Sequence, residues 1–152
     1  MPEFDDAWYE DWKSRMEEQG NVILALGLRP TALVPGERVV MEMPMSRNVR
    51  QGTGVFAAGA LMQLADVGAT MLCQSASGTP EAPGPFPLSV QISMNLVRNV
   101  DHGKAISESM FLHRGRTMMV VESKVRDEDG RLLCVVTSTH TLIARAPEAN
   151  GG

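Results

Sequence analysis

The chain has 152 residues, a formal net charge of −4 at pH 7, 43% hydrophobic residues and 21% charged residues. A chain of this length is most simply one domain with a real core, and its composition is that of an ordinary soluble globular protein. The acidic balance gives no electrostatic reason to expect a nucleic acid partner, and no uninterrupted apolar segment approaches the roughly 20 residues that span a bilayer.

One helix and two strands are predicted for the N-terminal third of the chain. The helix covers about residues 4–19, where four apolar side chains recur at intervals of four and Gly20-Asn21 follows as a stop signal. These side chains are Phe4, Trp8, Trp12 and Met16. A first strand is expected over Val22–Val34, interrupted near Pro30 because proline cannot donate to a central ladder. A turn signal then leads into a second strand over Arg38–Met43.

The stretch Ala57–Cys73 is predicted to form the central helix of the domain. It is rich in Ala, Leu and Met and apolar on nearly every side, as expected of a helix that other elements surround. One carboxylate, Asp66, lies in its middle. Because an ionised side chain buried without partners is costly, Asp66 is expected to have either a compensating network or a use in chemistry.

Four strands are predicted after a proline-rich loop over Ser75–Pro87. The first strand alternates in polarity, which predicts a polar face that includes Ser89 and Gln91 and an apolar face that includes Ile92 and Met94. The four strands span Ser89–Val97, Lys104–Leu112, Thr117–Arg126 and Arg131–Ile143.

The order of these elements predicts an α+β domain. An antiparallel sheet of five to six strands, apolar on one face, is expected to curl around the central helix and bury it, with the N-terminal helix as an addition. One domain is expected over residues 1–152, with its core at about 21–143 and a frayed tail at 147–152.

The motifs in this order resemble the hotdog-fold acyl-CoA thioesterases of the phenylacetate-degradation type. The resemblance covers roughly Asn21–Ile143 and rests on a glycine-bearing loop, an apolar helix with Leu-Ala-Asp, an alternating strand and a final Asp-Gly hairpin. The family signature is an Asn, a short link, His-Gly-Gly and an Asp nine residues after the His. Counted back from Asp66, the signature Asn falls on Gln51, and His-Gly-Gly falls on Ala57-Ala58-Gly59. Only the second glycine is kept among these four positions.

The resemblance implies that Asp66 is catalytic, either as a nucleophile toward the thioester carbonyl or as the base that deprotonates water. The backbone N–H groups of Ala58 and Gly59 lie at the expected start of the helix, where they can stabilise an oxyanion. Ser89 matches a Ser or Thr of the family and would orient water or the carboxylate, while Gln51 would position water or the thioester carbonyl. A homodimer or homotetramer with the site between subunits is also implied.

Three of these residues also have a structural interpretation. Asp66 can cap the backbone of a neighbouring subunit, and Ser89 can be a strand hydroxyl bonded to backbone. Gln51 can be an ordinary loop residue.

Other reactive side chains are assigned smaller roles. Arg114 and Arg116 belong to the most concentrated basic patch and are candidates for contacts with coenzyme A phosphates. Three histidines lack metal-ligand spacing, so no metal is expected and no cofactor beyond the coenzyme A of the substrate. These histidines are His102, His113 and His140.

The leading hypothesis is an acyl-CoA thioesterase that acts on a medium-chain or aromatic acyl-CoA. A noncatalytic protein that binds acyl-CoA or a fatty ligand is the alternative, because Ala57 replaces the motif His. A hydratase or dehydratase is a third possibility on fold analogy, although those sites usually use a His base. The cysteines, Cys73 and Cys134, are too few for a disulfide scaffold, and no signal peptide is visible, so a cytoplasmic location is expected, with no membrane partner.

Overall fold

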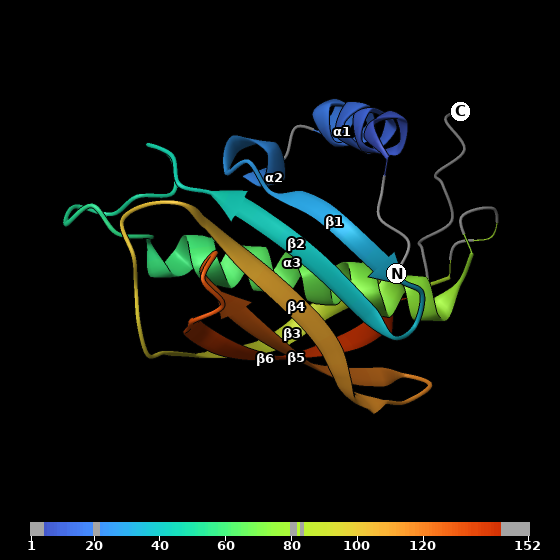
Figure 1. Ribbon diagram of the computed structural model, residues 1–152. Helices are drawn as coiled ribbons and strands as arrows, with labels where there is room; N and C mark the ends of the chain where they lie inside the picture. The colour runs from blue at the N-terminus through green and yellow to red at the C-terminus, as the bar shows by residue number, and fades with distance from the viewer. Residues whose placement is uncertain (1–4, 20–21, 80–81, 83, 144–152) are drawn as a thin grey trace, which may run out of the picture.

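The computed structural model describes residues 5–19, 22–79, 82 and 84–143. Two helices, two strands, one long helix and four strands follow one another along the chain (Figure 1). In order, they are α1 (Asp6–Gln19), α2 (Val22–Ala25), β1 (Arg29–Val34), β2 (Arg38–Pro44), α3 (Ala58–Ser77), β3 (Phe86–Leu96), β4 (Lys104–Arg114), β5 (Met118–Arg126) and β6 (Leu132–Ile143).

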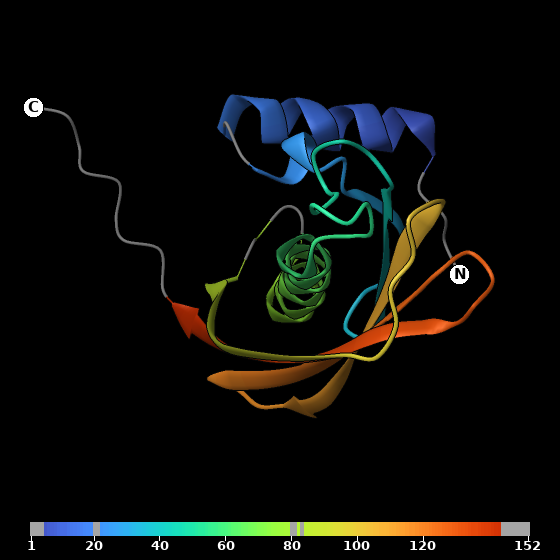
Figure 2. The ribbon, with the colours of Figure 1, turned by 90° about the vertical axis from the view of Figure 1, so that its left-hand side faces the viewer.

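The six strands form one antiparallel sheet in the order β1-β2-β4-β5-β6-β3. Viewed along α3, the sheet curves around two sides of this helix while α1 and α2 lie above it (Figure 2). No described helix or strand covers the remaining flank of α3, on the side of the free edge of β3 (Figure 2). This architecture confirms the predicted hotdog fold, with a sheet of six strands and an added N-terminal helix.

Small side chains let α3 lie close to the sheet. A Cβ atom on Gly68 would lie 3.0 Å from Ser109 Oγ on β4, which is tighter than nearly all real contacts of this kind. The hydroxyls of Ser109 and Ser123 hydrogen-bond each other at 2.7 Å beneath the helix, so these buried polar groups satisfy one another. Leucines of α3, among them Leu61, Leu64 and Leu72, are fully buried against this surface.

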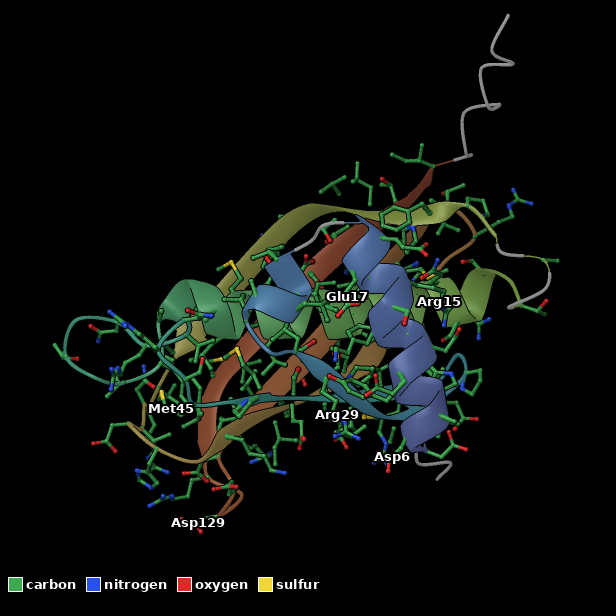
Figure 3. The ribbon with its side chains drawn as sticks, turned by 90° about the horizontal axis from the view of Figure 1, so that it is seen from above. Asp6, Arg15, Glu17, Arg29, Met45 and Asp129 are labelled. Atoms are coloured by element: carbon green, nitrogen blue, oxygen red, sulfur yellow. The ribbon has the colours of Figure 1, made fainter. Side chains whose placement is uncertain are left out.

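Helix α1 packs beside β1, at the other edge of the sheet. The Arg29 guanidinium of β1 lies 4.3 Å from the centre of the Tyr9 ring and 3.5 Å from Asp6 Oδ1. Trp12 is buried and stacks on Trp8. Figure 3 shows α1 crossing above α3, with Asp6 at the end nearer Arg29. Side chains of α1 therefore contact the β1 edge, whereas none of the described strands pairs with the outer edge of β3.

The predicted strand over Val22–Val34 is wrong in its first part, because Val22–Ala25 forms the short helix α2. Gly27 has a positive φ of 69° and donates to the carbonyl of Leu24, while the N–H of Leu28 bonds the carbonyl of Ile23. This pair of bonds is a Schellman motif, which ends a helical turn. The sequence interpretation gave more weight to the apolar run than to the glycine, which is why a strand was predicted here.

Other predicted boundaries differ from the structure by a few residues. Helix α3 continues to Ser77, one turn into the loop that was expected from Ser75. None of the described helices is long and apolar enough to cross a bilayer. The Gly20-Asn21 stop signal and the tail at 147–152 lie outside the described residues, and the extent of the domain stays a prediction.

Candidate active site

Asp66 lies on the flank of α3 that faces β3, and it is half-buried. One carboxylate oxygen, Oδ1, accepts a hydrogen bond of 2.6 Å from the hydroxyl of Ser89. Within the described part of the chain, the other oxygen accepts no hydrogen bond, and no lysine or arginine pairs with the carboxylate. Asp66 is thus not sealed in the core, and no cation among the described residues neutralises it.

A β-bulge in β3 brings Ser89 to this position. Ser89 pairs with His140 and Gln91 pairs with Thr139, so Val90 is an extra residue in the ladder. The bulge reverses the alternation of the strand: Ser89 points toward α3, and beyond the bulge Ile92 and Met94 do the same. The prediction that Ser89 shares a face with Gln91 is therefore wrong, since regular alternation was assumed through a strand that contains a bulge.

A buried histidine of β6 extends the Asp66–Ser89 contact, and the sequence interpretation assigned it no such role. His140 Nδ1 is 3.3 Å from Ser89 Oγ, and His140 Nε2 is 2.8 Å from Ser138 Oγ. Burial lowers the pKa of His140 below its ordinary value of 6.5, although the Asp66 carboxylate and the Pro87 carbonyl act in the opposite direction. The signal in the sequence was alternation in β6, which places Ser138 and His140 on the same face.

The N-terminus of α3 carries the two predicted backbone donors. Ala58 and Gly59 form its first turn and are exposed, and their N–H groups donate to no acceptor among the described residues. Ala57 precedes them without a side-chain cap. These amides are available to an anion, which the helix dipole favours at this end. Ala58 is eight residues before Asp66, about 12 Å along the helix axis, so one small reacting group does not reach both within one chain.

Gln51 lies in the loop that precedes α3, away from Asp66. Its side-chain amide is exposed, donates to Thr53 Oγ1 at 2.6 Å and accepts from the Thr53 N–H at 2.8 Å. The bridge between Arg50 and Phe56 holds the base of this loop. The structure therefore brings together Asp66 and Ser89 among the predicted site residues, but neither Gln51 nor the helix amides contact them in a single chain.

Arg114 and Arg116 line an open cleft of about 600 Å³ near the C-terminal end of α3. The Arg114 guanidinium donates to the carbonyl of Ala76 at 2.9 Å, so it caps the last turn of the helix. Ala76 is ten residues beyond Asp66, about 15 Å along the axis. The two arginines are thus close to each other and remote from the carboxylate of their own chain.

The cysteines are structural side chains. Cys73 and Cys134 are both free and fully buried, and burial raises the pKa of the Cys73 thiol to about 12 and that of Cys134 to about 11. Such a raised pKa disfavours the thiolate at neutral pH, so neither cysteine is a candidate nucleophile. Within the described ranges, no three His, Cys, Asp or Glu side chains are grouped so as to hold a metal ion.

The chain belongs to the thioesterase superfamily, whose family model matches residues 53–134, just over half of its length. Two bacterial proteins, named "Putative esterase" and "Putative esterase ComA2", are similar to this protein over most of the chain. The Deinococcus radiodurans protein is 30% identical over 82% of this chain and 76% of its own length. The Bacillus subtilis protein is 29% identical over 86% of this chain and 100% of its own. Family and relatives together support a hydrolase of ester or thioester bonds.

Solved structures show the same fold. A Haemophilus influenzae thioesterase has a TM-score of 0.79 at 20% identity, with 93% of this chain and 94% of that chain covered. A conserved Pseudomonas aeruginosa protein has a TM-score of 0.72 at 29% identity, covering 80% and 92%. The Escherichia coli PaaI protein, from the phenylacetic acid degradation operon, has a TM-score of 0.73 at 16% identity, covering 88% and 93%.

Proposed function

We propose that the protein is an acyl-CoA thioesterase that hydrolyses a medium-chain or aromatic acyl-CoA to the free acid and coenzyme A. The observation that carries this proposal is the Asp66 carboxylate, which Ser89 holds through one oxygen while the other oxygen is left for a reacting group. Membership of the thioesterase superfamily supports the reaction class. The likeness to PaaI is the support for the phenylacetate-degradation type.

The reaction adds water across the thioester. In one route, the Asp66 carboxylate takes a proton from water as the water oxygen attacks the carbonyl carbon. In the other route, the carboxylate itself attacks, and water then hydrolyses the mixed anhydride. Both routes place negative charge on the carbonyl oxygen, where the free N–H groups of Ala58 and Gly59 would stabilise it. The carbon–sulfur bond then breaks, and the coenzyme A thiolate takes up a proton.

We propose that the complete site lies between two copies of the chain, in a homodimer or in a homotetramer of such dimers. The separation of about 12 Å between Asp66 and the amide of Ala58 within one chain supports this arrangement. The free edge of β3, next to Asp66, supports it as well, because an unpaired edge strand is a ready surface for pairing with another chain.

Gln51 is proposed to orient water or the thioester carbonyl from the second subunit. Two solved structures of one Staphylococcus aureus protein carry alanine in place of a glutamine and of a glutamate 15 positions later. Gln51 and Asp66 are also 15 positions apart in this chain.

Arg114 and Arg116 remain the proposed contacts for coenzyme A phosphates. The free cysteines support a reducing, cytoplasmic location.

The Asp66→Asn variant tests the proposal. Asparagine keeps the shape of the side chain and an oxygen for Ser89, but it neither attacks a carbonyl nor deprotonates water. We expect kcat to fall by a factor of about 10³ or more, measured as release of free thiol from a panel of acyl-CoAs. Asp101→Asn, at an exposed loop carboxylate, is the matched control and should keep full turnover.

Wild-type turnover in Asp66→Asn, with an unchanged oligomer, would contradict the assignment of this residue. An absence of turnover in the wild-type protein, together with saturable binding of acyl-CoA, would instead favour the noncatalytic binding protein.

A further inference from the structure

Three contacts in series connect Asp66 to the interior of β6. The oxygen of Ser89 lies 2.6 Å from Asp66 Oδ1 and 3.3 Å from His140 Nδ1, and His140 Nε2 lies 2.8 Å from Ser138 Oγ. His140 is 0% exposed and Ser138 is 1% exposed. Water therefore does not compete for the inner two groups, and the contacts between them persist as one network.

The direction of each hydrogen bond follows from the chemistry of the two ends. An ionised carboxylate only accepts, so the hydroxyl hydrogen of Ser89 points to Asp66. The Ser89 oxygen is then an acceptor toward His140, which requires a hydrogen on Nδ1. In a neutral imidazole the other nitrogen, Nε2, keeps its lone pair and accepts from the Ser138 hydroxyl. All three hydrogens thus point toward the carboxylate.

The surroundings of His140 favour this neutral form. Asp66 of α3, Ser89 and the Pro87 carbonyl of β3, and Ser138 of β6 face the ring. Burial lowers the pKa of His140 and outweighs the carboxylate and the carbonyl, which favour the charged ring. In water a neutral imidazole prefers the hydrogen on Nε2, so the network selects the opposite tautomer.

We propose that His140 is a positioning residue of the thioesterase site, whose Nδ1–H fixes the Ser89 hydroxyl and, through it, the orientation of the Asp66 carboxylate. The proposal rests on the proposed function. Without this donor, the Ser89 hydroxyl is free to rotate away from Oδ1, and the carboxylate loses the contact that aims its second oxygen outward. His140 does not touch the substrate, so its loss should affect turnover more than substrate binding.

Two amide variants separate this role from general support of the core. In His140→Asn, the amide nitrogen takes the place of Nδ1 and keeps a donor toward Ser89. In His140→Gln, the amide group takes the place of Nε2, where its oxygen accepts from the Ser138 hydroxyl, and the donor toward Ser89 is lost. We expect kcat within about threefold of wild type for His140→Asn, and a loss of about tenfold or more for His140→Gln, with KM nearly unchanged in both.

Equal losses of kcat in the two amide variants, or a change confined to KM, would overturn the proposal. Because either variant can also lose stability, thermal unfolding and oligomeric state are measured for both. The two variants are compared only by the ratio of their kcat values, once both are shown to be folded.

The tautomer gives a test that does not depend on activity. Nitrogen-15 NMR of histidine-labelled wild-type protein at pH 7.5 distinguishes Nδ1–H from Nε2–H, and the His140 signal is identified by its absence in His140→Asn. We expect Nδ1–H. A ring with its hydrogen on Nε2 overturns this proposal even if Asp66→Asn is inactive. Absence of thiol release by the wild-type protein, beside an Nδ1–H ring, overturns the proposed function instead, so the two failures are told apart.

Discussion

Two reactive side chains of α3 differ in what their surroundings allow. Cys73 is seven residues after Asp66 on the same helix, but it is fully buried and its thiol pKa is raised to about 12. Asp66 is only half-buried and has one oxygen without a partner in the described chain. Of these two side chains, only the carboxylate is therefore available for chemistry. The apolar character of the helix does not by itself decide which of its side chains is reactive.

Gly59→Glu should separate stability from activity at the helix N-terminus. A Cβ atom at Gly59 meets nothing within 4 Å, so the fold has space for a side chain. Glutamate forms helix more readily than glycine and its charge suits the first turn, so we expect the free energy of unfolding to rise by about 1 kcal/mol. The same charge would repel the oxyanion, so thiol release should be lost. Gly59→Ala, which adds stability without charge, is the control. A Gly59→Glu variant that keeps wild-type turnover would exclude these amides from the reaction.

Element by element, the periodicities of the sequence predicted most of the fold. Apart from the start of β1, the six strands lie within a few residues of their predicted positions, because alternation and turn signals agree there. The site was harder to predict. Asp66 and Ser89 were identified by their places in a motif, but their contact requires a bulge that takes Val90 out of the regular ladder, and no local pattern indicates that bulge. His140 was missed because a lone histidine in a strand has no motif of its own.

Deletion of Val90 tests whether this residue is only the extra residue of the bulge. Ser89 pairs with His140 and Gln91 with Thr139, so without Val90 the ladder becomes regular and keeps both pairs. Regular alternation from Ile92, which packs against the core, then leaves Ser89 facing α3. We expect a folded protein that keeps most of its turnover, measured by thiol release beside circular dichroism. Ser89→Ala, which removes the hydroxyl and leaves the register unchanged, is the contrasting variant and should lower kcat by about tenfold or more. A deletion variant as inactive as Ser89→Ala would show that the bulge itself is needed to position Ser89.

For the whole molecule, mixing two inactive variants tests the shared site. Asp66→Asn and Gly59→Glu lie in different parts of the proposed site, so a mixed dimer has one site with both defects and one with neither. After the subunits are unfolded together and reassembled in equal amounts, about a quarter of wild-type turnover should return for a symmetric dimer. If each chain held a complete site, the mixture would stay inactive. The same experiment with either variant alone is the control.

The uncovered flank of α3 also affects how activity depends on protein concentration. Asp66 lies beside that flank, where α3 faces the edge strand β3, and the amides that would serve it are about 12 Å away along its own helix. A separated subunit would then carry every residue of the proposed site and still be inactive. At protein levels below the dissociation constant of the pair, the rate should rise with the square of the amount of protein, so the abundance of the chain in a cell would set its catalytic output more steeply than in proportion.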